Sequence, residues 1–217
     1  MVVHRNFSAL LICALAFFSP SARAGVILSE NFDPVSLPWT VMSSGRVAYG
    51  WELGSCGMLL NLTGGMGNAF CASSDLVGPG AFDLFLISPV LNLSGAGTAS
   101  LSYRANYQNY LNRDTLDLDI STNGGLGWIN VLRWKETHQG TFPELGVAVT
   151  VDLTPYLSPN FRFRWRYYDL APDAYDWFFH LDDIQVTTGA TPEIPEPGTA
   201  ALLAGGLGLL LLWRRRH

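Results

Sequence analysis

The sequence offers little of the cysteine and histidine that a zinc site needs. Three cysteines and four histidines occur in 217 residues, and only Cys56, Cys71, His138 and His180 lie between residues 25 and 190. A structural zinc ion needs four closely placed ligands. Two cysteines fifteen residues apart and two separate histidines do not supply them, so a zinc site is excluded.

Basic residues are also scarce in the central part of the chain. Residues 25–195 hold eight basic and seventeen acidic residues, which gives them a formal charge of −9. Such a surface repels nucleic acid and anionic lipid, and it is compatible with divalent cations and neutral glycans. We therefore expect no nucleic-acid partner.

Signatures of catalysis are missing as well. No nucleophile motif such as G-x-S-x-G accompanies His138 or His180. The Gly-Gly-Met-Gly run at 64–67 is no phosphate loop, because no Lys-Ser/Thr pair follows it. Carboxylates are plentiful, so a glycosidase pair stays open as an alternative, but the sequence singles out no pair. We expect no enzymatic activity.

Amphipathic helices of convincing length are absent between residues 25 and 190, where short alternating runs are broken by Gly, Pro, Asn and Ser. In one run Phe161, Phe163, Trp165 and Tyr167 share a side, and arginines occupy the other. Eight to twelve such strands around one apolar core predict an all-β fold, a jelly-roll β-sandwich over residues 25–188. The predicted strands are 26–32, 47–53, 69–73, 84–87, 99–107, 115–120, 128–134, 147–153, 161–168 and 177–187.

The N-terminus reads as a signal peptide. His4 and Arg5 precede an apolar run from residue 7 to residue 18, and Ala-Arg-Ala follows at 22–24. About a dozen apolar residues reach only ~18 Å as a helix, too short for a membrane anchor, which is the alternative interpretation. Cleavage after Ala24 by signal peptidase is therefore expected.

Cleavage at that point leaves two cysteines in the exported chain. Cys13 is removed with the signal peptide, and Cys56 and Cys71 then share an oxidising compartment. An even pair in that setting predicts one disulfide between Cys56 and Cys71.

The C-terminus carries a second processing signal. After a linker at 189–194, Pro195-Glu196-Pro197 leads into an apolar, helix-forming run at 200–213. The chain then ends on an arginine cluster, Arg214, Arg215 and Arg216, followed by a histidine. Arginines behind such a run stay cytoplasmic, which predicts a short transmembrane helix at 195–217 with the β domain on the far side of the inner membrane.

This ending resembles the PEP-CTERM sorting signal. The resemblance implies cleavage near the Pro-Glu-Pro by an exosortase, followed by release or transfer into extracellular polysaccharide. It also implies transient anchoring in the inner membrane of a Gram-negative-type envelope and a final place in the medium or at the cell surface. An ordinary tail anchor is the alternative.

Five short segments follow one another along the domain. They are Glu-Asn-Phe-Asp at 30–33 with Pro-Trp at 38–39, Leu-Ile-Ser-Pro at 86–89, Asp-Leu-Asp-Ile-Ser-Thr-Asn-Gly-Gly-Leu-Gly-Trp at 117–128, Val-Asp-Leu at 151–153, and Leu-Asp-Asp-Ile-Gln-Val at 181–186. In this order they resemble MAM-like and cleaved-adhesin domains, the group called choice-of-anchor J in proteins with sorting tails. Asn123 stands where that pattern usually has Asp, which weakens any inference of metal binding at that turn.

Carboxylates in the first and last strands form a candidate calcium site. Asp182 and Asp183 interrupt an otherwise apolar strand, and Asp182 shares a side with Ile184 in the alternation. Glu30 and Asp33 lie in the first strand, which commonly neighbours the last one in jelly rolls. Hard oxygen ligands from both strands could hold Ca²⁺, as the resemblance also implies. Alternatively, Asp182 caps backbone amides or pairs with an arginine.

Two further groups are candidates for ligand binding. Asp173, Tyr175, Asp176 and Trp177 form an acidic and aromatic loop of the composition that sugar-binding sites use for ring stacking, unless it is a plain loop. A row of charged residues could form a binding face or a solvated face with cross-strand ion pairs. Its members are Asp117, Asp119, Arg162, Arg164 and Arg166.

Taken together, these features predict an exported, non-catalytic surface or matrix protein. We expect it to bind a glycan or a protein within extracellular polysaccharide. A purely structural matrix component without a specific ligand is one alternative, and a carbohydrate-active hydrolase is another.

Overall fold

The computed structural model describes residues 25–45, 51–54, 60–73, 80–141, 145–171 and 177–190. Within these ranges the chain forms eleven strands and one short 3-10 helix. The elements are β1 (Gly25–Glu30), β2 (Thr40–Gly45), β3 (Trp51–Gly54), β4 (Ala69–Ser73), β5 (Phe82–Ile87), β6 (Thr98–Gln108), β7 (Thr115–Ser121), β8 (Ile129–Trp134), β9 (Val147–Asp152), η2 (Thr154–Tyr156), β10 (Arg162–Asp169) and β11 (Phe178–Gly189).

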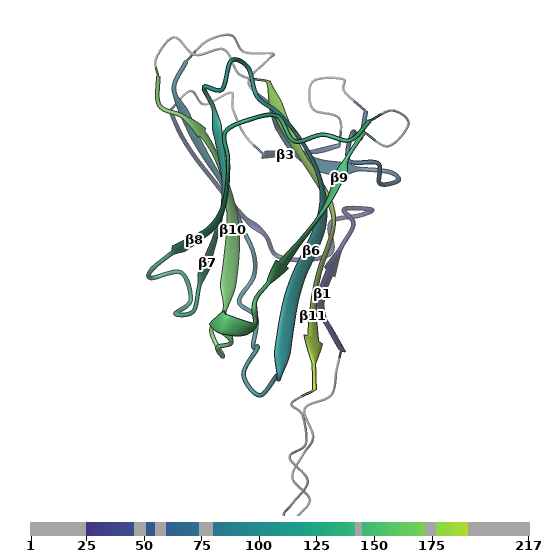
Figure 1. Ribbon diagram of the computed structural model, residues 1–217, viewed down its shortest axis with the longest axis vertical. Coiled ribbons are helices and arrows are strands. Elements are labelled where there is room, and N and C mark those ends of the chain that lie inside the picture. The colour runs from purple at the N-terminus through teal and green to yellow at the C-terminus, as the bar shows by residue number, and fades with distance from the viewer. Residues whose placement is uncertain are drawn as a thin grey trace, which may run out of the picture.

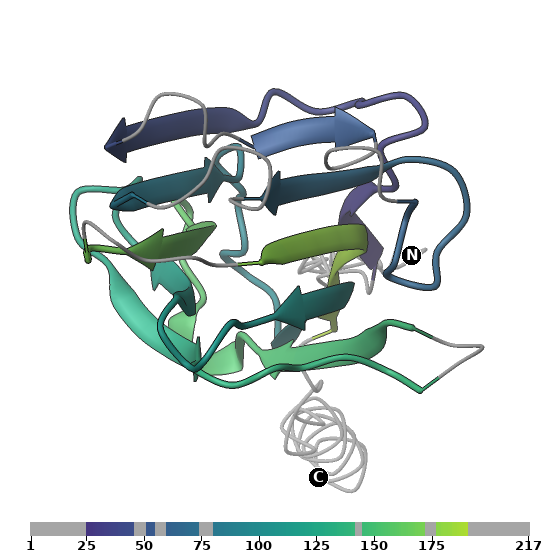
Figure 2. The ribbon, with the colours of Figure 1, turned by 90° about the horizontal axis from the view of Figure 1, so that it is seen from above.

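The strands form two antiparallel sheets packed face to face, which confirms the predicted β-sandwich. One sheet has the order β2-β5-β10-β7-β8, and the other has the order β3-β4-β11-β6-β9 with β1 added beside β11. In the end-on view of Figure 2 the five-stranded sheet lies on the left and the six-stranded sheet on the right. Strand β2 was not predicted, because all six of its residues are exposed and carry no alternating signal.

Aromatic side chains from both sheets fill the space between the layers. The predicted inward row of β10 is confirmed, since Phe163, Trp165 and Tyr167 are fully buried. Trp165 meets Tyr103 of the opposite sheet edge-to-face, with ring centroids 5.1 Å apart. Burying such rings drives the two sheets together.

Strand β11 changes partner along its length, which creates a fork in the six-stranded sheet. Its first residues, Phe178 to Leu181, pair with β4, and its later residues, from Ile184 on, pair with β1. The register against β6 shifts by one residue between Asp182 and Gln185, as in a β-bulge. Asp183, inside this bulge, has a φ of 49°. The loops that follow β1 and precede β4 meet over the fork.

The two ends of the sandwich differ in what they carry. Gly25 pairs with Thr188, so the first strand begins where the last one ends, at the lower end in Figure 1. The connections between β6 and β7 and between β10 and β11 lie at the opposite end. We call these the tail end and the distal end. Strand β1 begins directly after the predicted cleavage site, Ala24, which itself lies outside the described residues.

Candidate functional site

The carboxylate of Asp182 lies at the fork, but on the side opposite to the one expected. Strict alternation predicted that Asp182 lies on the same side of the strand as Ile184. This prediction was wrong, because the bulge between Asp182 and Gln185 shifts the alternation by one residue. Asp182 instead shares the outer face of the sheet with its cross-strand neighbour Arg104. It is fully buried there, because residues 60–68 lie across it.

Hydrogen bonds hold this carboxylate under the loop. Oδ2 accepts from Nδ2 of Asn61 at 2.7 Å, and Oδ1 accepts from the backbone N–H of Asp183 at 2.7 Å. Burial, together with the charges of Asp183 and Asp33, raises the pKa of Asp182 to about 6. Arg104 does not pair with it and donates to the carbonyl of Thr63 at 2.9 Å. Two alternative roles were predicted for Asp182, hydrogen bonding to backbone amides or pairing with an arginine. The structure shows the first, with the amide of Asp183.

A glycine-rich loop separates the carboxylates of Asp33 and Asp182. Asp33 Oδ1 accepts from the backbone N–H of Asn68 at 2.9 Å. A Cβ atom on Gly67 would collide with Asp33, and one on Gly65 would collide with Asp182. The glycines of this loop therefore serve a close approach to two carboxylates, not a phosphate.

Glu30, one of the predicted metal ligands, accepts hydrogen bonds from the loop that follows it. Its carboxylate is buried and accepts from the backbone N–H groups of Phe32, Ser36 and Leu37 at 3.0 Å each. It also accepts from the Ser36 hydroxyl and the Trp39 indole, both at 3.2 Å. Glu30 thus organises the 31–39 loop, and its role as a metal ligand stays a prediction.

The four predicted calcium ligands are consequently not gathered at one point. Asp183 is exposed and lines a separate hollow with Ser29, Glu30 and Gln185. Across the described ranges, no three His, Cys, Asp or Glu side chains are grouped so as to hold a metal ion. Only Asp33 and Asp182 still face a common loop.

His180 lies beside Asp182 on the same covered face. Its Nδ1 accepts from the backbone N–H of Leu62 at 3.3 Å, so the proton of the neutral ring is on Nε2. Burial lowers the pKa of His180 to about 4. The ring is therefore neutral at physiological pH and acts as an acceptor that holds the loop.

An aromatic pair marks the distal end. Trp177 is 40% exposed and packs on Tyr110, which is 39% exposed, with ring centroids 5.9 Å apart. Leu111 and Leu170, on the same two connections, are also largely exposed. The other residues of the predicted binding loop, Asp173, Tyr175 and Asp176, lie outside the described residues. The sequence pointed to Trp177 but not to Tyr110, whose only signal was an aromatic three residues after the end of a predicted strand.

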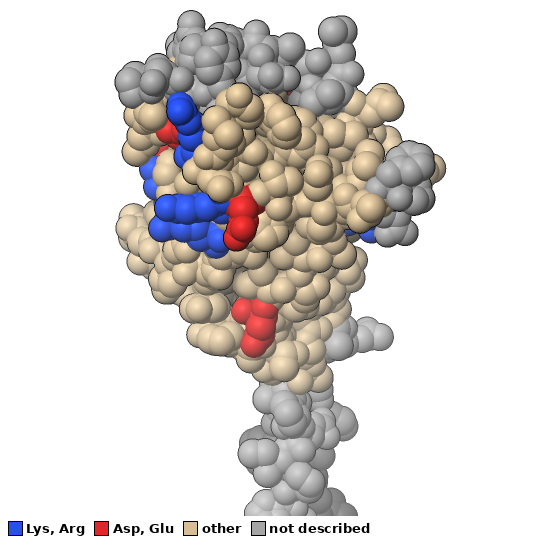
Figure 3. Space-filling view, turned by 45° about the horizontal axis from the view of Figure 1, so that its top comes forward, with Lys and Arg blue, Asp and Glu red and all other residues tan. Residues whose placement is uncertain are grey.

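The charged row on β7 and β10 was predicted to be either a ligand-binding face or a face with cross-strand ion pairs. The structure shows cross-strand ion pairs. Arg164 pairs with Asp119 at 2.9 Å, and Arg166 pairs with Asp83 at 2.7 Å. The third pair joins Arg133 to Asp117 at 2.7 Å. The guanidinium of Arg164 also stacks over the ring of Trp128. On the face shown in Figure 3, basic side chains gather over the five-stranded sheet with acidic ones beside them. These arginines are engaged with protein partners.

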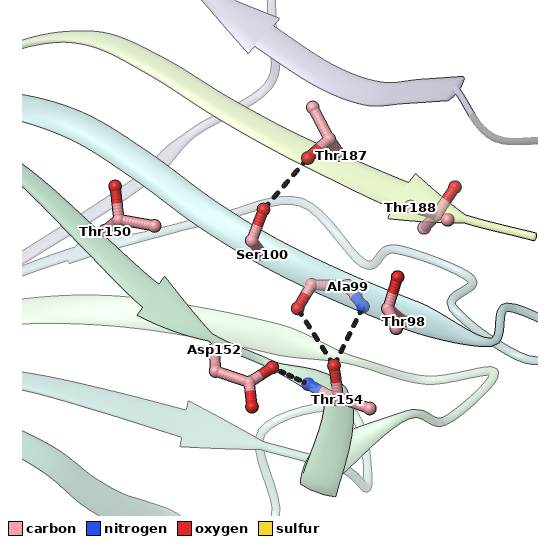
Figure 4. Close-up of a pocket in the computed structure, with 9 residues that line it drawn as sticks. Thr98, Ala99, Ser100, Thr150, Asp152, Thr154, Thr187 and Thr188 are labelled. Carbon is pink, nitrogen blue, oxygen red and sulfur yellow. Dashed lines mark hydrogen bonds between the residues drawn. The ribbon is translucent and has the colours of Figure 1, made fainter.

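A groove lined by hydroxyl groups crosses the outer face of the six-stranded sheet near the tail end (Figure 4). Its volume is ≈ 530 Å³. Ser100 and Thr187 hydrogen-bond across it at 2.9 Å, and Asp152 accepts from the backbone N–H of Thr154 at 2.9 Å. The hydroxyls of Ser100 and Thr187 satisfy each other, and those of Thr154 and Thr188 bond to the backbone. The groove is therefore a polar sheet face.

Several predicted sites fall wholly or partly outside the described residues. They are Cys56, the signal peptide at 1–24, Pro195-Glu196-Pro197 and Arg214 to Arg216. Cys71 is buried in β4 and disulfide-bonded, and its pairing with Cys56 stays a prediction. Among the residues that the structure describes, none belongs to a helix long and apolar enough to cross a membrane.

Comparison with solved structures agrees with the sandwich. The K1 cleaved adhesin domain of Lys-gingipain from Porphyromonas gingivalis W83 superposes with a TM-score of 0.53 and 16% identity, over 73% of this chain and 96% of that one. The K3 domain of the same protein gives 0.52 and 16%, over 76% and 100%. The K2 domain gives 0.51 and 19%, over 75% and 98%. No curated protein matches this chain.

The tail is matched at the level of sequence. Residues 193–216 match the PEP-CTERM protein-sorting motif, which implies export and surface sorting in Gram-negative bacteria. The last strand ends at Gly189, so the sandwich and the matched motif occupy separate parts of the chain. The chain thus carries a PEP-CTERM protein-sorting motif at 193–216, behind a β-sandwich with the fold of the cleaved adhesin domains.

Proposed function

We propose that the exported chain is a non-catalytic adhesion module that binds a glycan through its distal end. The observation that carries the proposal is the half-exposed pair of Tyr110 and Trp177. Two tilted rings, fixed by the ends of paired strands, offer apolar faces for the pyranose rings of a neutral sugar. A domain charge of −9 favours a neutral ligand over an anionic one.

The placement of the tail supports this proposal. Trp177 directly precedes β11, and the sorting tail follows its last residue, Gly189. The twelve residues of β11, at ~3.3 Å each, separate Trp177 from the start of the tail by about 40 Å. While the tail holds the chain at the membrane, the aromatic pair therefore lies at the end farthest from it.

Binding to purified extracellular polysaccharide and to a glycan array tests the proposal. Trp177→Ala and Tyr110→Ala should each lower retention at least tenfold, because each removes one stacking face. Leu126→Ala is the matched control, since Leu126 is 91% exposed in the β7–β8 turn at the tail end. Equal retention of all four proteins would refute the distal site. No retention of the wild type by any glycan would favour the structural matrix component. Release of new reducing ends from the polysaccharide would instead favour a hydrolase.

Calcium is a second proposal, for the fork. Asp33 and Asp182 would supply carboxylates, and the carbonyls of Gly67 and Asn68 lie in the same loop, within 3.5 Å and 3.2 Å of Asn61 Nδ2. Hard oxygens of this kind suit Ca²⁺, which would tie the first strand to the last. A hundredfold excess of calcium over Kd should add about 2.7 kcal/mol to the free energy of unfolding. The same melting temperature in calcium and in a chelator would exclude both this site and any other calcium site.

A further inference from the structure

Two buried carboxylates at the distal end lack the partners that buried charges need. Asp114 is fully buried; its carboxylate oxygens have no hydrogen bond of good geometry, although the hydroxyls of Tyr167 and Tyr107 interact with them. Asp169 is 6% exposed; its Oδ1 accepts from the backbone N–H of Ala171 at 2.7 Å, but its Oδ2 has no partner. Buried polar atoms are nearly always paired, so the unpartnered Oδ2 of Asp169, beside a second buried carboxylate held only by tyrosine hydroxyls, requires an explanation.

The sheet register places these carboxylates opposite each other. Tyr168 of β10 pairs with Thr115 of β7 in the antiparallel ladder. Extending this register by one residue beyond the start of β7 would bring Asp114 opposite Asp169, and the charge of Asp169 acts on Asp114. Both follow the inward alternation of their strands, since Tyr167 and Leu116 point into the core. Directly opposed Cβ atoms in such a ladder are about 5 Å apart, and like charges at that spacing repel.

Among the residues that the structure describes, no basic side chain pairs with either carboxylate. The hydroxyls of Tyr107 and Tyr167 lie close enough to oppose the effect of burial, yet burial and the charge of Asp169 still raise the pKa of Asp114 to about 7. One shared proton would neutralise one charge and hydrogen-bond the two carboxylates to each other, but the second charge would stay buried without a cationic partner.

We propose that Asp114 and Asp169 together bind a divalent cation with a preference for oxygen ligands, for which Ca²⁺ is the probe. The ion matches the double negative charge of the pair and would give the unpartnered Oδ2 of Asp169 a partner. It would pin the end of the β6–β7 connection to the end of β10, directly beneath the connections that carry Tyr110 and Trp177. The site is separate from the fork and does not depend on glycan binding.

Thermal unfolding of the exported protein with Asp182→Asn, which removes the fork carboxylate, tests the site. In this background saturating Ca²⁺ should still raise the melting temperature by several degrees over a chelator. Adding Asp114→Asn or Asp169→Asn should abolish the shift, because asparagine keeps the shape and removes the charge. Near-UV circular dichroism shows whether each double variant keeps its tertiary packing.

Terbium luminescence gives a readout that does not depend on stability. Tb³⁺ replaces Ca²⁺ at oxygen sites, and Tyr107 and Tyr167 near the pair should sensitise its emission. We expect one saturable site in Asp182→Asn and none after Asp169→Asn is added. If Asp182→Asn shows neither a calcium shift nor saturable emission, the distal site does not exist. Asp114 and Asp169 then share a proton instead. Through this pair, the stability of the protein depends on pH and not on calcium.

Discussion

Replacing Glu30 by glutamine separates its structural role from a role as a calcium ligand. Oε2 accepts from four donors of the 31–39 loop, and Oε1 accepts from the Phe32 N–H. In Glu30→Gln the remaining oxygen can take the position of Oε2, where it is held by donors such as Leu37. The new NH₂ group then faces the Phe32 N–H, and the loop loses its charged acceptor.

The expected cost follows from these contacts. One buried donor without a partner costs about 1–3 kcal/mol, and loss of the charge weakens the remaining bonds to Oε2 as well. We expect Glu30→Gln to lower the free energy of unfolding by about 3 kcal/mol. For a domain of this size that is about 6–12 °C in melting temperature. Glu52→Gln, on an exposed residue of β3, controls for the loss of one negative charge.

Thermal unfolding in a chelator and in saturating calcium gives the decisive comparison. If Glu30 acts only through protein donors, Glu30→Gln loses the same stability in both conditions, and Glu52→Gln loses none. A deficit that appears only with calcium would refute this reasoning and return Glu30 to the metal ligands. A variant as stable as the wild type in the chelator would show that the loop does not depend on Glu30.

Three further predictions concern pH, sorting and the disulfide. Because the folded state lowers the pKa of His180 from 6.5 to about 4, the unfolded chain takes up its proton first as pH falls. His180 therefore lowers the free energy of unfolding by up to about 3 kcal/mol as pH falls from about 6.5 to about 4, while the raised pKa values of Asp182 and Asp114 act in the opposite direction. His180→Asn, which keeps an acceptor for the Leu62 N–H, should lose less over that window in urea unfolding, and equal losses would contradict the assignment. Alanines at 195–197 should leave the protein in the membrane fraction of cells with an active exosortase, whereas unchanged release into the medium would count against this processing. Freshly secreted protein should show Cys56 and Cys71 as one disulfide in non-reducing mass spectrometry, and two free thiols would disprove the pairing.

Local patterns in the sequence were enough for the all-β class, the inward row of β10 and the sorting tail. Side-chain alternation depends only on residues two apart in the chain, so the buried faces of Phe163 and Trp165 could be read directly. The Pro-Glu-Pro, the apolar run and the arginines are likewise contiguous and need no partner elsewhere. Strand β2 was missed because its exposed residues carry no such pattern.

Strand pairing decided what local patterns could not. One extra residue in β11 moves Asp182 from the core side to the outer face, and a bulge becomes visible only against the register of β6. Glu30 could not be told from a metal ligand until the 31–39 loop folded back onto its carboxylate. Asp114 and Asp169 are far apart in the chain, and they oppose each other because β7 and β10 are neighbours in the sheet. The sequence by itself determined which residues alternate and which signals flank the domain. The tertiary structure alone decided which carboxylates meet, because their distance depends on strand pairing and not on spacing along the chain.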